Sequence, residues 1–325
     1  HTRLAAVSGL GDVYKRQVGS YVIWGLSNKD GIELGVVAKD ERNKRLKNEG
    51  ITINGVKYTP NVWTPKEAKD ADLLIVCLKY GNLLDTLDDI EKIVGENTIV
   101  MSLMNGVDSE EIIGKRINPN NILHSFIKVA SQKKEDGYHF DPETTIGIIL
   151  GELQPPFESE RIKAINHLFA NTGIHWRVTE FIQEEIWGKF RLNVCNNLPQ
   201  AILGAGVGCY HDSEHMSFIR KALRGEVESI AEAKGIDLSK IDDSSGRGSA
   251  VKASARYSTL QDIDAGRHTE IDMFSGALVR MGKELGIPTP YNEYTYHMIK
   301  ALEEKNDGIF NYCLLYTSPS PRDCS

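Results

Sequence analysis

Two runs of consecutive apolar residues limit most strongly what this chain can fold into. Residues 72–78 read Asp-Leu-Leu-Ile-Val-Cys-Leu, and residues 97–104 form a second run of the same kind. Strands that are apolar on both faces are typical of a parallel sheet covered by helices on each side. Such sheets bind their ligands at the carboxyl ends of the strands. The sequence therefore predicts an open α/β domain with site residues just after its strands.

The chain divides into two parts that differ in their predicted secondary structure. Up to residue 178, short strands alternate with helices, which predicts a Rossmann-type domain over 18–178. From residue 179 helices follow one another without strands, which predicts an all-α domain over 179–312. In that second part we expect one long helix over 181–203, a break at the glycine-rich segment 204–208, and further helices to residue 312.

Both ends of the chain look like translated sequencing-adapter sequence. Residues 9–17 and 313–319 can be encoded by one DNA element read in its two directions, with a shift of one base. We therefore expect residues 1–17 and 313–325 to be artefacts that do not take part in the fold. On this interpretation, the first strand of the Rossmann-type domain is lost or replaced.

Composition argues against several functional classes. The net charge of -7 is unlike that of a nucleic-acid-binding domain. No apolar run approaches the roughly 18 residues of a membrane span. The five cysteines form no CxxC pair, which fits a reducing cytoplasm. The histidines are scattered, so we expect no metal.

Gly19 is interpreted as the last glycine of a dinucleotide loop. In a GxGxxG pattern ending there, Tyr14 and Arg16 occupy the places of the first two glycines. A helix that begins at Gly19 would offer free N–H groups and its dipole to a pyrophosphate. The alternative is a simple turn glycine.

Polar residues follow three predicted strands. Lys39 and Arg42 come after the strand over 32–38, where a basic residue accommodates the 2′-phosphate of NADP. Asp40 at the same place keeps NAD open. Lys79 and Asn105 follow the two apolar runs, and the strand order would bring them to one edge of the sheet.

One face of a predicted helix carries three polar residues that could bind a ligand. Lys189, Asn193 and Asn197 are spaced i, i+4 and i+8 and therefore lie on one side of the predicted helix. An unpaired amide on a half-buried helix is costly, so these amides indicate a polar ligand. The alternative is a set of solvated or capping side chains. Glu270, after His268, reads equally as surface charge.

Five motifs then carry a resemblance: Trp187-x-Lys189-x-x-x-Asn193-x-x-x-Asn197, Leu78-Lys79, Asn105-Gly106, Ser258-x-x-Leu-Gln-Asp262 and Arg267-His-Thr-Glu-Ile-Asp272. Together and in this order they resemble 2-dehydropantoate 2-reductases, the ketopantoate reductase family. The resemblance covers roughly residues 18–312. Its specific part is the lysine–asparagine helix combined with the Arg-His-Thr-Glu-Ile-Asp segment.

The resemblance implies an NADPH-dependent reduction of 2-dehydropantoate to (R)-pantoate, a step toward pantothenate and coenzyme A, in a crevice between the two domains. Lys189 is implied as the catalytic proton donor, and Glu270 as a second catalytic residue that helps to order the ternary complex. The implied substrate-binding residues are Asn105, Asn193, Asn197 and Ser258. The implied NADP(H)-binding residues are Gly19, Ser20, Lys39, Lys79, Asn105, Ala130 and Glu270.

The chemistry of ketone reduction agrees with this implication. Hydride transfer to a carbonyl carbon produces an alkoxide, which needs a proton and a nearby positive charge. A lysine ammonium supplies both, and burial would lower its pKa toward the working pH. One departure concerns the helix: family members commonly have proline directly after the second asparagine, whereas here Leu198 precedes Pro199.

Two other functions remain open on sequence alone. One is a reductase or dehydrogenase for another small 2-oxo or 3-hydroxy acid on the same two-domain plan. The other is a non-catalytic NADP(H)-binding protein. By analogy of fold we also expect a possible homodimer. Under every reading the expected partner is a small molecule rather than a nucleic acid or a membrane.

Overall fold

The computed structural model describes residues 2–8, 16–241 and 252–310. The chain divides into two compact units, His1–Trp187 with Ser239–Ile241, and Gly188–Leu238 with Asp242–Ser325. The sequence predicts a boundary at 178/179, and the units divide somewhat later, inside helix α6 (Ile182–Leu192). The sequence also predicts a loop at residues 242–248, which lie outside the described residues.

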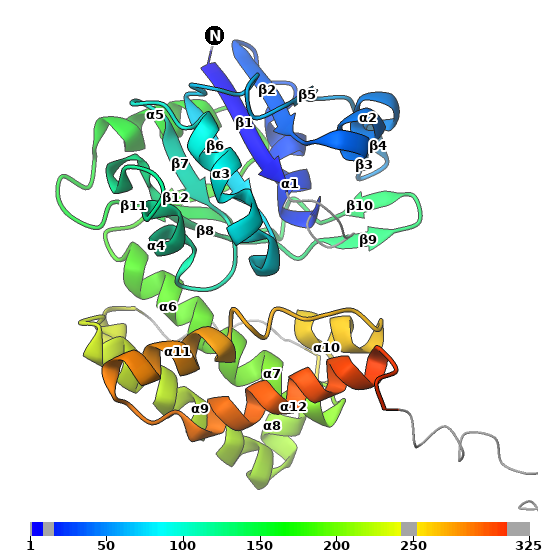
Figure 1. Ribbon diagram of the computed structural model, residues 1–325, viewed down its shortest axis with the longest axis vertical. Coiled ribbons are helices and arrows are strands. Elements are labelled where there is room, and N and C mark those ends of the chain that lie inside the picture. Colours follow the sequence, from blue (N-terminus) through cyan, green and yellow to red (C-terminus); the bar gives the residue numbers. More distant parts are fainter. Residues whose placement is uncertain (1, 9–15, 242–251, 311–325) are drawn as a thin grey trace, which may run out of the picture. The chain divides into compact units, whose positions relative to one another are not determined.

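The first unit is built on a five-stranded parallel sheet in the order β5-β2-β1-β6-β7 (Figure 1). From one edge to the other, its strands are Asn61–Trp63 (β5), Ile32–Val37 (β2), Thr2–Ser8 (β1), Leu73–Cys77 (β6) and Ile99–Ser102 (β7). Successive strands extend the sheet to one side of β1 up to β5 and then to the other side with β6 and β7. The strand order therefore reverses at β1, which is where open α/β sheets bind their ligands.

The central strand differs from expectation. We expected the first strand to be lost or replaced and residues 1–17 to take no part in the fold, whereas Thr2–Ser8 forms β1 and pairs in parallel with both β2 and β6. The reason is the short apolar run in this segment: Leu4 and Ala5 are each 1% exposed and pack on opposite faces of the sheet. An adapter origin of residues 1–17 and 313–325 stays a prediction.

Helices cover both faces of this sheet. Leu73, Ile75 and Cys77 of β6 belong to a core shared with α1 (Arg16–Leu26) and α5 (Glu160–Phe169). Leu74 and Val76 belong to a second core shared with α3 (Leu83–Ile93) and α4 (Ser109–Gly114). This alternation along one apolar strand confirms the predicted doubly covered sheet. Helix α2 spans Asp40–Glu49.

Two smaller sheets complete the first unit. One has the order β4-β3-β10-β9, and the other β12-β11-β8. Their strands are Ile51–Ile53 (β3), Val56–Tyr58 (β4), His124–Lys128 (β8), Gln132–Lys134 (β9), Gly137–His139 (β10), Gly147–Gly151 (β11) and Trp176–Val178 (β12). Ile182 and Ile186 of α6 pack on Phe126 of β8 and Ile149 of β11.

The described part of the second unit contains helices and connecting segments without strands, as predicted. Its helices after α6 are Leu198–Leu203 (α7), Cys209–Asp212 (α8), Glu214–Ala233 (α9), Ser258–Asp264 (α10), Ser275–Leu285 (α11) and Pro290–Asn306 (α12). The one long helix expected over 181–203 is interrupted: a π-helical turn at Asn193–Asn197 separates α6 from α7.

Candidate functional site

The strand register places three predicted residues along one edge of the parallel sheet. Val37 pairs with Val7 and Cys77 pairs with Ser8, so β2, β1 and β6 end at nearly the same level. Lys39 follows β2, Lys79 follows β6, and Asn105 follows the neighbouring β7. Three polar residues from distant parts of the sequence therefore follow strand ends at the carboxyl edge, where β1 lies between β2 and β6 and where β6 and β7 are neighbours.

The start of α1 contains two residues predicted for the cofactor, and both of them are buried. Gly19 and Ser20 lie in the first turns of α1, the helix that follows β1. A Cβ added at Gly19 would meet no described atom within 4 Å. The described chain therefore leaves space beside this backbone, which suits the approach of a phosphate to a helix start. Ala130, also predicted for the cofactor, is exposed just beyond β8.

Lys39 already has a partner within the first unit. Its Nζ lies 2.5 Å from Oδ2 of Asp89, a mostly buried carboxylate on α3. Lys92 approaches the same carboxylate at 3.8 Å. Much of the charge of Lys39 is thus compensated, so a cofactor phosphate at Lys39 would compete with Asp89 for the ammonium group.

The loop that carries Asn105 is fixed by a buried polar chain. Ser102 Oγ lies 2.9 Å from Ser109 Oγ, and Ser109 Oγ donates to Oε2 of Glu110 at 2.6 Å. Ser125 Oγ donates to the carbonyl of Ser102 at 3.0 Å. Burial raises the pKa of Glu110 to about 7. These bonds hold both ends of the Asn105 loop against β7 and β8.

A second contact links the Asn105 loop to the neighbouring strand end. The hydroxyl of Tyr80, directly after Lys79, donates to Oδ2 of Asp108 at 2.6 Å. The segments that carry Lys79 and Asn105 are therefore tied together by side chains as well as by strand register.

In the second unit the two predicted amides are in contact. Asn197 Nδ2 donates to Asn193 Oδ1 at 3.4 Å, and both residues belong to the π turn. Lys189 is half-buried and lies in α6 just before this turn. Ser258 is the first residue of α10, and α10 contacts both the π turn and α7. The second unit thus brings the elements of these four predicted residues together.

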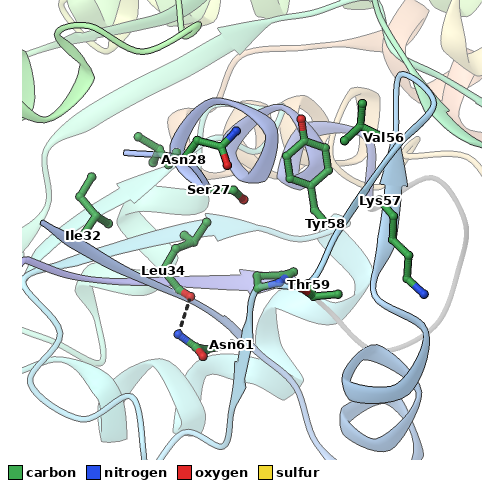
Figure 2. A pocket seen from close by; sticks show the side chains of 11 residues that line it. Ser27, Asn28, Ile32, Leu34, Val56, Lys57, Tyr58, Thr59 and Asn61 are labelled. Carbon is green, nitrogen blue, oxygen red and sulfur yellow. Dashed lines mark hydrogen bonds between the residues drawn. The ribbon is translucent and has the colours of Figure 1, made fainter. Parts of the chain in front are cut away.

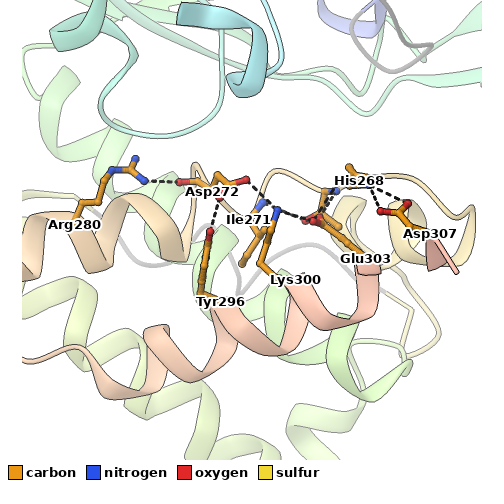
Figure 3. A network of polar contacts seen from close by, with 9 residues as sticks. His268, Ile271, Asp272, Arg280, Tyr296, Lys300, Glu303 and Asp307 are labelled. Atoms are coloured by element: carbon orange, nitrogen blue, oxygen red, sulfur yellow. Dashed lines mark hydrogen bonds and ion pairs between the residues drawn. The ribbon is translucent and has the colours of Figure 1, made fainter. Parts of the chain in front are cut away.

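Glu270 lies in the segment between α10 and α11. Figure 3 shows the polar network through which α12 holds other residues of this segment. Glu303 of α12 is 2% exposed, and its Oε1 accepts from both the backbone N and Oγ1 of Thr269, each at 2.7 Å. Lys300 Nζ lies 3.0 Å from Oε2 of Glu303 and 3.5 Å from Oδ2 of Asp272. The residues on both sides of Glu270 are therefore held by buried or half-buried charges.

A glycine-rich segment that sequence analysis treated only as a helix break supports the start of α10. Val207 N donates to the carbonyl of Ala255 at 3.0 Å, and Gly208 N donates to that of Ala253 at 2.9 Å. A Cβ on Gly206 would lie 2.3 Å from the Ala253 oxygen. Glycine is needed here because the two backbone segments approach so closely. The spacing of the glycines over 204–208 was the sequence signal from which this contact could have been predicted.

The first unit also has an open pocket of about 350 Å³ that sequence analysis did not predict (Figure 2). It lies where β2 and β5 begin, at the opposite end of the strands from Lys39 and Lys79. Its lining comprises Leu26, Ser27, Asn28, Ile32, Leu34, Val56, Lys57, Tyr58, Thr59, Pro60 and Asn61. The pocket is therefore separate from the predicted cofactor residues.

Clusters of metal-ligating side chains and membrane-spanning helices are both absent from the described part of the chain. Within residues 2–8, 16–241 and 252–310, no cluster of three or more His, Cys, Asp or Glu side chains could hold a metal ion. Over that same part of the chain, every helix is too short or too polar to cross a bilayer.

A doubly covered parallel sheet with polar strand ends, followed by a helical unit, defines a two-domain protein whose first unit is of the Rossmann type. Comparison with family models specifies it further. Residues 17–151 match the model described as ketopantoate reductase PanE/ApbA, and residues 181–303 match its C-terminal counterpart. The chain belongs to the ketopantoate reductase family.

Individual relatives agree with this family. A 2-dehydropantoate 2-reductase of Streptococcus pyogenes serotype M3 is 28% identical over 266 residues, which cover 79% of this chain and 86% of the relative. Two solved structures share the fold, each covering 94% of this chain and 99% of their own. They are D-mandelate dehydrogenase with NADH and anilino(oxo)acetate, with a TM-score of 0.75 at 21% identity, and a dimeric ketopantoate reductase from Staphylococcus aureus, with a TM-score of 0.73 at 17% identity.

Proposed function

We propose that this protein reduces 2-dehydropantoate to (R)-pantoate with NADPH. The observation that carries the proposal is the contact between Asn193 and Asn197, one helical turn beyond Lys189, in a chain of the ketopantoate reductase family. A bound reduced nicotinamide supplies the hydride. Lys189 donates the proton that the resulting alkoxide needs, and its charge stabilises that alkoxide as it forms.

The other predicted residues bind and orient. The amides of Asn193 and Asn197 hydrogen-bond the substrate hydroxyl groups, and the hydroxyl of Ser258 hydrogen-bonds the carboxylate. Asn105 lines both the substrate and the nicotinamide, and Glu270 helps to order the ternary complex. That the crevice between the domains brings these residues to the nicotinamide is part of the proposal.

For the cofactor we propose NADP(H), bound along the carboxyl edge of the sheet. The backbone at Gly19, where an added Cβ would meet no described atom, and that at Ser20 would receive the pyrophosphate. Lys79 and Ala130 would line the cofactor, and Lys39 would bind the 2′-phosphate. The pair of Lys39 with Asp89 makes this testable, because Asp89→Asn removes a competitor for the lysine. We expect the preference for NADPH over NADH to rise in Asp89→Asn and to fall in Lys39→Ala. If the preference for NADPH over NADH is the same in the two variants, the result favours NAD as the cofactor.

A reductase of another small 2-oxo acid is the second candidate. It is favoured by the shared fold of D-mandelate dehydrogenase, a structure that contains anilino(oxo)acetate. We also propose that the protein is cytoplasmic and forms a homodimer, the latter on the fold shared with a dimeric ketopantoate reductase.

The decisive experiment is a NADPH-oxidation assay with a panel of 2-oxo acids. Preference for 2-dehydropantoate supports the proposal, and preference for another acid supports the second candidate. Cofactor binding without turnover of any acid would point to a non-catalytic binding protein. In Lys189→Met we expect kcat to fall by about 10² to 10⁴, the usual contribution of one general acid. Lys283→Met, at an exposed lysine paired with Glu293, is the matched control and should keep full activity.

A further inference from the structure

The side chain of Tyr210, from α8, is inserted into the helix that carries Lys189, Asn193 and Asn197. Its hydroxyl donates to the carbonyl of Asn196 at 2.6 Å and accepts from the backbone N of Gln200 at 3.1 Å. In a regular α-helix, the N–H of residue 200 would donate directly to the carbonyl of residue 196. The Tyr210 hydroxyl therefore replaces one bond of the helical ladder, and a side chain inserted into this ladder distorts a helix.

Pro199 weakens the preceding rung of the same ladder. Proline has no N–H to donate to the carbonyl of Cys195, and its ring collides with that carbonyl in regular helical geometry. The helix responds by widening into the π turn at Asn193–Asn197, which only Leu198 separates from the proline. Tyr210 and Pro199 thus act on adjacent rungs, which accounts for the position of the turn.

The π turn changes how the two amides face each other. In an α-helix, residues four apart overshoot a full turn by about 40°. A π turn contains more residues per turn, so residue 197 instead stops short of the position above residue 193. In the observed geometry Asn197 Nδ2 donates to Asn193 Oδ1. This bond leaves an amide donor on Asn193 and a carbonyl acceptor on Asn197, a pair that suits one hydroxyl group.

The same hydrogen-bond system reaches the third proposed substrate residue. Gln200 is fully buried, and its Oε1 accepts from the backbone N of Tyr257 at 2.7 Å. Tyr257 directly precedes Ser258 at the start of α10. The Tyr210 hydroxyl therefore holds the backbone of Gln200, and the Gln200 side chain in turn holds the segment that carries Ser258.

We propose that Tyr210 is a positioning residue that sets the π turn and thereby the hydroxyl-binding geometry of Asn193 and Asn197. This inference rests on the proposed function for its kinetic consequence, and on the helix geometry for its structural one. Tyr210→Phe keeps the ring, which is 9% exposed, and removes only the inserted hydroxyl. The N–H of Gln200 then donates to Asn196 directly, and the amide pair turns away from its present orientation.

The kinetic test separates positioning from stability. In Tyr210→Phe we expect KM for the hydroxyl-bearing 2-oxo acid to rise about tenfold, as for the loss of one good hydrogen bond, with KM for NADPH unchanged. Tyr21→Phe is the matched control, since Tyr21 accepts from the backbone N of His175 at 2.8 Å in the first unit. It should lower stability and leave KM for the acid unchanged. An unchanged KM for the acid in Tyr210→Phe, or an equal rise in both KM values, overturns the proposal.

A structural readout keeps the inference testable if the proposed reaction fails. In a crystal structure of Tyr210→Phe, the Gln200 N–H should donate directly to the Asn196 carbonyl and the Asn197–Asn193 bond should be lost, while Pro199 still distorts the helix locally. Hydrogen exchange at the Gln200 amide should change. A retained Asn197–Asn193 bond overturns the inference whatever the enzyme reduces. Loss of that bond in a protein that reduces no 2-oxo acid supports the role of Tyr210 and contradicts the proposed function alone.

Discussion

The two units position their candidate residues by different means. In the first unit, Lys39, Lys79 and Asn105 follow three parallel strands, and the backbone ladder places them at one edge, to which side-chain bonds are added around the Asn105 loop. In the second unit, the candidate residues lie on a distorted helix turn and an irregular segment. There, buried side chains such as Glu303 and Gln200 hold the backbone through hydrogen bonds to its N–H groups.

This difference indicates which substitutions each half of the candidate site tolerates. A backbone ladder is made of groups that every residue except proline carries, so most side-chain substitutions leave it intact. Its weak points are places where backbone meets backbone without room for a Cβ. A site held by single buried side chains has the opposite character, because the loss of one polar atom leaves a buried partner unsatisfied.

The largest effect is expected from a methyl group placed on the backbone-controlled unit. Gly147 of β11 has φ of 88°, and an added Cβ would lie 1.9 Å from the carbonyl oxygen of His175. Gly147→Ala should cost about 4 kcal/mol or more. Gly204 has φ of 71° but no described atom within 4 Å of an added Cβ, so Gly204→Ala should cost only about 1 kcal/mol. Urea unfolding measures both, and equal losses would contradict the contrast.

Two buried titratable groups of the first unit should give opposing pH dependence. Burial raises the pKa of Glu110 from 4.5 to about 7, so its contribution to stability is lost as pH rises through this window. Burial lowers the pKa of His124 from 6.5 to about 4, so its contribution is lost as pH falls through 6.5 toward 4. Each shift corresponds to about 3 kcal/mol.

Single substitutions should separate the two opposing effects of pH on the free energy of unfolding. Between pH 4.5 and 6.5, Glu110→Gln should make the free energy of unfolding rise with pH, because His124 then dominates. His124→Asn should make it fall with pH, and the unmodified protein should vary least. The measurement is unfolding in denaturant at several pH values, and parallel curves for both variants would show that neither group acts as described.

A smaller effect is expected at Glu303 in the second unit. Glu303→Gln keeps the size of the side chain and its acceptor for Thr269, but removes the charge that Lys300 faces at 3.0 Å. We expect a loss of about 1.5 to 3 kcal/mol, the range for a hydrogen bond to a charged group. Lys163→Gln, which breaks the exposed pair with Glu160, is the control and should change stability by well under about 1 kcal/mol. Thermal unfolding compares the two, and equal shifts would argue against a special role for the buried network.

The smallest effect is expected at Gln200. Gln200→Met preserves the shape of the side chain but removes the acceptor for the Tyr257 N–H, at a cost of about 1 kcal/mol in stability. Because Tyr257 precedes Ser258, KM for the 2-oxo acid should also rise, in addition to this loss of stability. Steady-state kinetics beside thermal unfolding tests this, and a change confined to stability would restrict Gln200 to a packing role.

Much of the fold could be predicted because its signals are local. The apolar runs at 72–78 and 97–104 specify strands covered on both faces, and the polar residues after them specify the edge where Lys79 and Asn105 lie. The spacing of Lys189, Asn193 and Asn197 likewise reports one helix face before any coordinates are known. These periods are properties of neighbouring residues, so the sequence contains them directly.

Tertiary structure alone decided how these residues are held. The place of Thr2–Ser8 at the centre of the sheet, the pair of Lys39 with Asp89, and the π turn stabilised by Tyr210 each depend on partners far away in sequence. No local period encodes which distant hydroxyl will enter a helical ladder or which carboxylate will reach a lysine. Such choices are made only when packing brings the groups together and each buried polar atom must find a partner.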